Sequence, residues 1–531
     1  NSVRFMALRL NLRWEMFNEV DRYLAVTPGV RQKIVQRENF NVFFHYGLNT
    51  FTGKEWGDGK VDPKVFDPEK QDTDQWVRTA KEAGAYGVIL TCKHHDGFCL
   101  WPTATTDYNI SATPYKDGKG DVVREVSESC KKYGMKFGVY LSPWDRNHPA
   151  YSTPAYNDVY CAQLTELLQN YGRVFCVWLD GACGAYMDGK EKQEYDWKRF
   201  FALIRKLAPD ACISNCGPDV RWVGNEGGFA RESEWNVVPK FSYDIQTIEE
   251  NSQKEDDGKF AKKGADVVFS DLGSRKFLSK YNDFIWYPAE VDVSVRPGWF
   301  YHKSQDGLVK SLQTVERIYY TSVGGNSLLL LNFPPDRRGL IHENDVALAK
   351  ALGARLRESE RQAVKIAQIK APEGEKGHEA FCVTDCAYDR ETGDPVSYYT
   401  PEKESDGYRI EIRLERKVKI NRVRIIENTA FSQRIEKFTV YAETDGKFRK
   451  RYDGSTVGYN RICVFDKPAV TDRLIISIDE CRRKPYIEFI GVYEDNGVVI
   501  KKPRFFRLRQ FIHEKSYKLF IEKENKKYCS K

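Results

Sequence analysis

One unit recurs along the chain from about residue 36 to residue 358: an apolar strand, a polar loop, an amphipathic helix, a glycine and the next strand. Strands are expected at residues 40–45, 86–91, 136–141, 174–180, 211–215 and 328–332. Helices are expected at 73–83 before Gly84, after a cap at Asp121, and from Thr153-Pro154. This alternation predicts a parallel α/β fold, and its length favours a closed (β/α)8-like barrel over residues 36–358. The stretch 240–288 gives no clear position for strand six.

After about residue 360 the pattern changes to short runs of alternating apolar residues. They lie at residues 409–414, 418–426, 438–442, 473–478 and 487–493, with turn residues between them. This pattern predicts an all-β sandwich over residues 360–495. Its course resembles discoidin-like carbohydrate-binding jelly rolls, and both a purely structural and a sugar-binding sandwich remain open.

The positive charge of the chain is concentrated at its C-terminus. The whole sequence carries a net charge of +7, but residues 497–531 hold 11 Lys and Arg against 3 Asp and Glu, so the remainder is nearly neutral. We therefore expect a basic tail at 496–531, solvated or binding a partner, rather than a nucleic-acid-binding protein. Residues 1–35 are expected to be an N-terminal extension.

Composition narrows the class of protein further. No run of eighteen apolar residues is present, so no membrane span is expected. The first residues show no export signal, and the compartment and oligomeric state stay open. The 13 cysteines are scattered without a CxxC pair, which favours buried thiols over a disulfide framework. The 11 Trp, 30 Tyr and 30 Phe suit a protein that stacks aromatic rings on sugar faces.

Polar side chains follow five consecutive predicted strands, where the βα loops of a barrel converge. They are His45, residues 93–98, residues 140–145, Asp180 and residues 219–226. Asp180 shares a strand face with Cys176 and Trp178, so its side chain should point into the barrel. A strand-end Asp can instead cap the next helix, which is the alternative to a catalytic role.

Glu226 is the candidate partner for Asp180. It lies 46 residues further along and is expected in an adjacent βα loop, with glycines on both sides. Glycoside hydrolysis uses such a pair of carboxylates on either side of the bond that breaks. A solvated loop glutamate is the alternative.

The His94-His95 pair raises the question of a metal site. Adjacent residues on an extended segment point in opposite directions, and no Cys or Glu lies nearby at zinc spacing, so neither a metal nor a cofactor is predicted. Imidazoles that donate hydrogen bonds to sugar hydroxyls fit the pattern better, with packed core histidines as the alternative. Glu55-Trp56 and Trp299 place polar groups beside rings, although each tryptophan could also belong to the core.

Several segments together resemble the α-L-fucosidases of glycoside hydrolase family 29. They are residues 44–47 (FHYG), 55–57 (EWG), 92–98 (CKHHDGF), 142–147 (SPWDRN) and 177–182 (VWLDGA), of which KHHDGF is highly specific. Residues 221–226 (RWVGNE), 293–300 (VSVRPGWF) and 332–336 (NFPPD) are similar to the subfamily acting on α-1,3- and α-1,4-linked fucose. The resemblance covers residues 25–355 in order, and more loosely extends to 495.

The resemblance implies a retaining exo-α-L-fucosidase that removes terminal α-1,3/1,4-linked fucose from branched oligosaccharides or glycoprotein glycans by double displacement. It implies that Asp180 is the nucleophile and Glu226 the general acid/base. Fucose-binding positions fall on His45, Glu55, Trp56, His94, His95, Tyr140 and Trp299. Two other hypotheses remain: a sugar-binding protein with a catalytically silent barrel, and a related exo-glycosidase for another terminal sugar.

Overall fold

In the computed structural model, which describes residues 20–182, 192–243 and 267–500, eight parallel strands close into a barrel. In order around the barrel they are β1 (Phe40–Phe44), β2 (Gly87–Lys93), β3 (Lys136–Leu141), β4 (Val174–Leu179), β5 (Cys212–Asn215), β6 (Val220–Trp222), β9 (Ala289–Ser294) and β10 (Leu328–Asn332). Strand β10 pairs with β1 and completes the closure. The predicted (β/α)8-like barrel is confirmed.

The sixth barrel strand lies where the sequence suggested a loop. Strand β6 is three residues long and pairs with β5 on one side and β9 on the other. Strand β8 (Phe284–Trp286), inside the stretch that resisted assignment, pairs instead with β7 (Val237–Pro239) in a separate antiparallel sheet. Glu226 therefore follows the second strand after β4, and the expectation that it lies in the loop adjacent to Asp180 was wrong.

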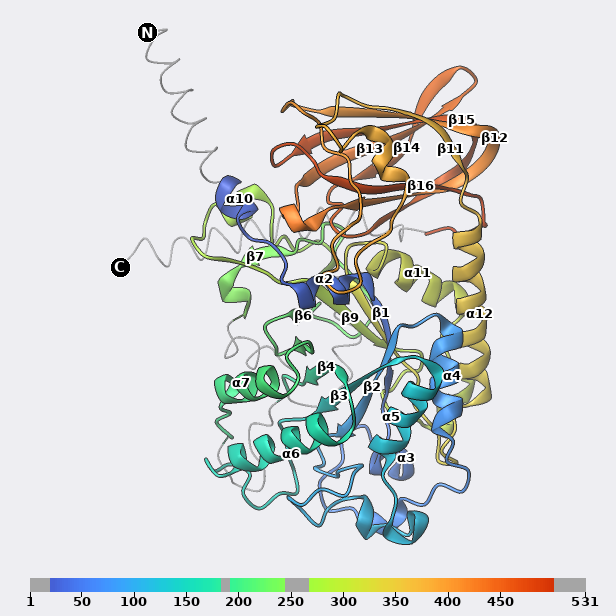
Figure 1. Cartoon of the computed structure of the whole chain (residues 1–531). Helices are drawn as coiled ribbons and strands as arrows, with labels where there is room; N and C mark the ends of the chain where they lie inside the picture. The colour runs from blue at the N-terminus through green and yellow to red at the C-terminus, as the bar shows by residue number, and fades with distance from the viewer. Residues whose placement is uncertain (1–19, 183–191, 244–266, 501–531) are drawn as a thin grey trace, which may run out of the picture.

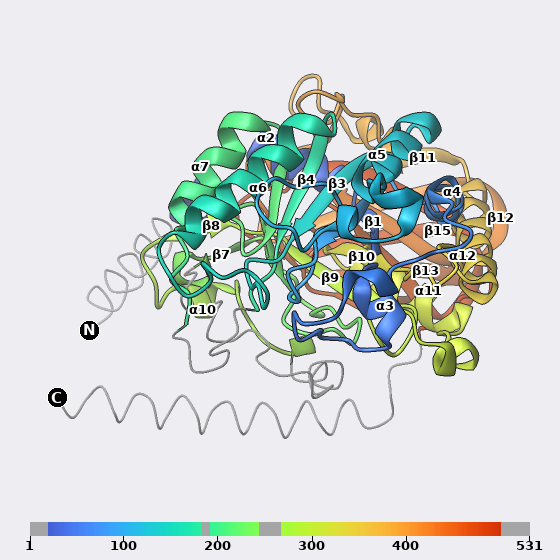
Figure 2. The same ribbon diagram turned by 90° about the horizontal axis from the view of Figure 1, so that it is seen from below.

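Helices surround the barrel, as Figure 2 shows. They include α4 (Thr73–Ala83), α5 (Val122–Tyr133), α6 (Tyr156–Asn170), α7 (Trp197–Leu207), α11 (Leu312–Ser322) and α12 (Glu343–Arg361). Helix α5 has the predicted ends: the Asp121 carboxylate accepts from the backbone N–H of Arg124, and Gly134 closes the helix at φ 65°. Helix α4 likewise ends at Gly84, whereas α6 begins at Tyr156, just beyond the predicted Thr153-Pro154 start.

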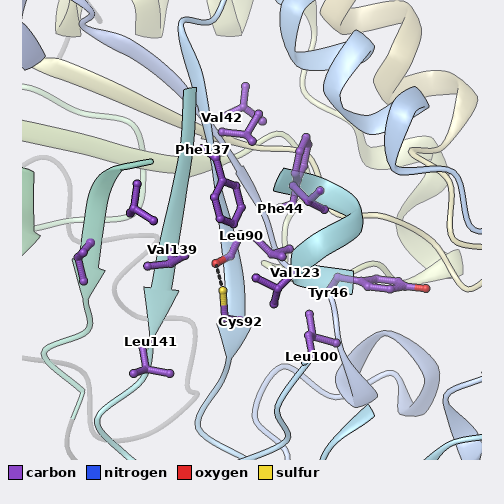
Figure 3. Close-up of a cluster of buried hydrophobic side chains, with 14 of the residues drawn as sticks. Val42, Phe44, Tyr46, Leu90, Cys92, Leu100, Val123, Phe137, Val139 and Leu141 are labelled. Carbon is purple, nitrogen blue, oxygen red and sulfur yellow. Dashed lines mark hydrogen bonds between the residues drawn. The ribbon is translucent and has the colours of Figure 1, made fainter. Parts of the chain in front are cut away.

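Alternating side chains on the strands build two cores. Figure 3 shows Val42 and Phe44 of β1 on the outer face, among the apolar side chains that also include Leu90 and Val123. Phe43, between them in sequence, belongs instead to the cluster inside the barrel. Burying a large apolar side chain contributes about 1.5–3 kcal/mol, so both faces of β1 stabilise the barrel, as is usual for a parallel strand that is covered on both sides.

The N-terminal end of the barrel is covered by α2 (Val30–Arg37) and by a residue of the C-terminal domain. Val35 and Tyr459 join the internal cluster. The Gln32 side chain donates to the backbone carbonyls of Asp219 and Trp286 at 3.0 and 2.7 Å. In Figure 1, α2 lies between the barrel and the C-terminal domain, while α3 (Leu48–Thr52), which follows β1, lies at the opposite end. The strand ends that carry the predicted site therefore face away from that domain.

The C-terminal domain is a six-stranded antiparallel sheet. Its strands are β11 (Ile366–Lys370), β12 (Tyr408–Glu427), β13 (Ile435–Thr444), β14 (Lys447–Gly454), β15 (Arg461–Cys481) and β16 (Ile487–Glu494). The first half of β12 pairs with β11 and its second half pairs with β16, so the two long strands β12 and β15 pass through both layers of a sandwich around one apolar core. This confirms the predicted all-β region, although the sequence divided β12 into two strands.

The four-part division of the chain stays a prediction. Its boundaries at 35/36 and 358/360 fall inside α2 and α12, and the basic tail lies outside the described residues from 501 onward. Eleven cysteines in the described ranges are free thiols, and most of them are buried. None of the helices in those ranges is long and apolar enough to cross a membrane.

Candidate active site

A cavity of about 80 Å³ opens at the C-terminal ends of the barrel strands. One water occupies about 10–15 Å³ on this measure, so the cavity has the size of one sugar ring rather than of an oligosaccharide. Eight of the nine predicted site residues line it: His45, Trp56, His94, His95, Tyr140, Asp180, Glu226 and Trp299. The ninth, Glu55, is not part of the lining.

Asp180 directly follows β4 and is held by two hydrogen-bond donors. Its Oδ1 accepts from the backbone N–H of Ala182 at 2.7 Å, and its Oδ2 accepts from the Tyr140 hydroxyl at 2.8 Å. Burial raises the pKa of Asp180, whereas both donors act in the opposite direction because they stabilise the ionised form. The cap of α7, the next described helix, is Asp196, so Asp180 does not serve that helix as its cap.

Glu226 lines the same cavity and has a second carboxyl group near it. Asp292 of β9 also lines the cavity, and the Trp222 indole N–H donates to its Oδ1 at 2.6 Å. Burial, followed by the charge of Glu226, raises the pKa of Asp292 well above its usual range. Asp292 is buried and Glu226 is partly buried, and two neighbouring carboxyls that repel each other do not both ionise easily, so the pair favours retention of one proton.

The three histidines of the cavity are buried, and burial lowers the pKa of each, which favours the neutral imidazole with one N–H donor and one acceptor nitrogen. Burial lowers the pKa of His45 and of His95 to about 3. Asn332 donates from Nδ2 to the backbone carbonyl of Trp299, so its Oδ1 faces His45 and accepts from His45 Nδ1 at 2.9 Å. The remaining nitrogen of His45, Nε2, is therefore the unprotonated one and can accept from a sugar hydroxyl.

The expectation that His94 and His95 point in opposite directions was wrong. The chain turns after β2, their rings lie with centroids 4.1 Å apart, and both face the cavity. His94 Nδ1 is buried without a hydrogen-bond partner among residues 20–182, 192–243 and 267–500. Across these same ranges, no three His, Cys, Asp or Glu side chains gather in a way that could hold a metal ion.

Glu55 supports the cavity wall from behind. Its Oε2 accepts from the backbone N–H of Trp299 at 2.7 Å, and its Oε1 contacts His302 Nε2 at 2.5 Å. A Cβ on Gly298 would lie 2.2 Å from the Glu55 carboxylate, so a larger residue there would push the carboxylate away from these contacts. In this structure Glu55 holds the segment that carries Trp299.

A buried ion pair joins the motif at the end of β2 (residues 92–98) to the motif in the loop after β3 (residues 142–147). Lys93 Nζ contacts Asp145 Oδ2 at 3.1 Å, and both side chains are at most 1% exposed. Asp145 Oδ1 accepts from the backbone N–H groups of Asn147 and His148, and the Asn147 side chain donates to the carbonyl of Gly59. The polar residues of these motifs therefore fix the loop conformation around the cavity.

Two acids on β9 were missed by the sequence analysis. Asp292 lines the cavity, and Glu290 lies two residues earlier on the same strand face. Glu290 Oε1 accepts from the Trp178 indole at 2.8 Å and from the Ser214 hydroxyl at 3.1 Å, and burial raises its pKa to about 7. Acids spaced by two residues in an otherwise apolar strand were the signal that could have revealed them.

A closed α/β barrel with a sugar-sized cavity lined by carboxyls, imidazoles and indoles at the strand ends defines a glycoside hydrolase. The alpha-L-fucosidase family model matches residues 31–360. Alpha-L-fucosidase 1 from Arabidopsis thaliana is 35% identical over 88% of this chain and 87% of its own length. The chain therefore belongs to the alpha-L-fucosidase family, glycoside hydrolase family 29.

Solved structures show the same similarity. A Bacteroides ovatus protein is 41% identical with a TM-score of 0.77, over 92% of this chain and 78% of that one. A glycoside hydrolase 29 family member from an unknown rumen bacterium is 33% identical with a TM-score of 0.69, over 90% and 80% of the two chains. A Ruminococcus gnavus GH29 fucosidase in complex with fucose is 28% identical with a TM-score of 0.74, over 90% and 96%.

Proposed function

We propose that this alpha-L-fucosidase is a retaining exo-enzyme in which Asp180 is the nucleophile and Glu226 the general acid/base. The observation that carries the proposal is that both carboxyls line one sugar-sized cavity, with Asp180 fixed by Tyr140 and the backbone of Ala182. Double displacement needs a fixed carboxylate on one side of the scissile bond, here Asp180, and a group that can donate a proton on the other side, here Glu226.

In the first step, an Asp180 oxygen attacks the anomeric carbon while Glu226 donates its proton to the departing glycosidic oxygen. The new carbon–oxygen bond is an ester to Asp180, and the aglycone leaves as an alcohol. In the second step, Glu226 takes a proton from water, the water oxygen attacks the anomeric carbon, and the ester bond breaks. Asp180 is then regenerated as a carboxylate and Glu226 as an acid.

The surrounding residues suit a 6-deoxy sugar. The neutral rings of His45, His94 and His95 offer nitrogens to the sugar hydroxyls. Trp56 and Trp299 add apolar surface against which the methyl group can pack. The fucose complex of the Ruminococcus gnavus relative supports a fucosyl group as the occupant.

We also propose that the enzyme prefers α-1,3- and α-1,4-linked fucose in branched glycans. The support is the segment 221–226, which contains β6 and ends at Glu226 on the cavity wall. Comparing kcat/KM on a Lewis-type trisaccharide and on a linear 2′-fucosylated trisaccharide tests this preference. The branched substrate should be cleaved faster, and an equal or faster rate on the linear one would refute the linkage assignment.

A further inference from the structure

A second and larger cavity lies at the opposite end of the barrel. It has a volume of about 480 Å³ and lies between the starts of β1 and β2, the ends of α11 and α12, and strands β12 and β16 of the sandwich. Cavities of about 300–1,000 Å³ are typical of small-molecule sites. Figure 1 shows α11 and α12 extending towards the sandwich where these elements meet.

Arg422 is the buried cation of this cavity. Only 1% of its surface is exposed, and its guanidinium donates to the side-chain oxygens of Gln362 at 3.1 Å and Asn421 at 3.2 Å. Within the ranges that the structure describes, no carboxylate forms a salt bridge with it. Burying an arginine without an anionic partner is costly, so an anion in the cavity would stabilise it.

The charged side chains that line the cavity are mostly arginines. Five arginines and one acidic residue line it: Arg37, Arg357, Arg361, Arg422, Arg424 and Glu360. Arg37 is neutralised by Glu488 behind the wall, and the closest Arg424–Glu360 contact is 3.8 Å. Arg361 is exposed at the rim, so a charged ligand could reach it from solvent.

Aromatic rings complete the lining. Tyr86, 48% exposed, lies on the wall together with Phe40, Tyr319 and Tyr493. Guanidinium groups recognise sulfate and carboxylate through paired hydrogen bonds, and tyrosine rings pack against sugar faces. We propose that this cavity binds a mono- or disaccharide that carries a sulfate or carboxylate group, with Arg422 as its anion-binding residue.

This site is separate from catalysis. The five residues of β1 span the distance from Phe40 at the second cavity to His45 at the first, which is roughly 17 Å at 3.3 Å per residue. The enzyme would therefore hold an acidic sugar of a glycan at one end of the barrel while a fucosyl group is processed at the other. The inference does not depend on the roles of Asp180 and Glu226.

Calorimetric titration of the full chain tests the proposal, with excess fucose present to fill the catalytic cavity. Galactose 6-sulfate and glucuronic acid are the probes, and galactose and inorganic sulfate are the controls. Galactose 6-sulfate should bind, and Arg422→Gln should weaken its binding roughly ten-fold, as expected for loss of a charge-assisted hydrogen bond. Arg361→Ala at the rim should weaken it roughly two- to five-fold.

Arg413→Ala is the matched control, because Arg413 is an exposed arginine of β12 outside the cavity lining. It should bind the probe as the unchanged protein does, and all three variants should keep kcat/KM on an aryl fucoside. Should Arg422→Gln unfold, the doubly substituted Arg357→Ala/Arg361→Ala protein replaces it. Absence of probe binding, unchanged binding in the cavity variants, or equal affinity for galactose or for inorganic sulfate would overturn the proposal.

Discussion

Lys93→Met should destabilise the protein strongly, because it leaves a buried carboxylate without its cation. Lys93 Nζ has three partners: Asp145 Oδ2 at 3.1 Å, the Tyr156 hydroxyl at 2.8 Å and Gln163 Oε1 at 2.9 Å. Removing one member of a buried ion pair costs about 3–5 kcal/mol. Burial tends to raise the pKa of Asp145, but Lys93 and two backbone donors hold it below its usual range. Without Lys93 that pKa should rise, so the deficit should shrink at acidic pH, where Asp145 can take a proton.

Urea unfolding followed by tryptophan fluorescence at pH 5 and pH 8 measures these effects. Lys136→Met is the control, since Lys136 is 42% exposed and pairs with Glu38 at the surface, where a pair contributes about 0–1 kcal/mol. Adding Asp145→Asn to Lys93→Met should recover much of the loss, because it removes the unpaired charge. A loss below about 1 kcal/mol for Lys93→Met, with no difference between the two pH values, would refute this reasoning.

Three further predictions concern the acids around the site. Burial raises the pKa of Glu290 from 4.5 to about 7. Ionisation of Glu290 in the folded protein therefore removes up to about 3 kcal/mol of stability as the pH rises from 4.5 to about 7. Glu290→Gln should flatten the resulting fall of Tm between about pH 5 and pH 8. Asp292→Asn should move the alkaline limb of the kcat/KM–pH profile on oligosaccharides to lower pH, because Glu226 loses a neighbouring carboxyl that shares its proton. An unchanged pH profile would refute the coupling of the two carboxyls. Glu55→Ala and Trp299→Ala should each raise KM roughly ten-fold. The double variant should raise KM no more than either single variant, because Glu55 acts by holding Trp299. Additive effects would place Glu55 in direct contact with substrate.

The sequence predicted the barrel wherever a strand was long and apolar. Strand β10, with four consecutive leucines, needs no tertiary information to be recognised. Strand β6 has only three residues and contains Arg221, so neither its length nor its composition distinguishes it from a loop. Strand β9 carries Glu290 and Asp292 on its inner face. Because these acids interrupt the apolar pattern, the sequence analysis recognised neither the strand nor the two acids.

The site was predictable from strand ends but its internal contacts were not. Asp180 and His45 each directly follow a strand, and parallel strands bring such residues together. The contact of Glu55 with Trp299 joins positions 244 residues apart, and no local pattern encodes it. The orientation of His94 and His95 depends on a turn after β2 that an extended-strand assumption misplaces.

The assignment of Asp180 as nucleophile and Glu226 as acid/base is tested most directly by azide rescue of the two alanine variants. Asp180→Ala should lose about three or more decades of kcat, and Glu226→Ala should lose about 10²–10⁴-fold on natural substrates while sparing activated aryl fucosides. With an activated aryl α-fucoside and azide, NMR then identifies the product anomer. Glu226→Ala should give the α-azide, because azide displaces the β-linked ester of Asp180, and Asp180→Ala should give the β-azide by direct displacement. The opposite anomers would mean that the two carboxylates have exchanged roles.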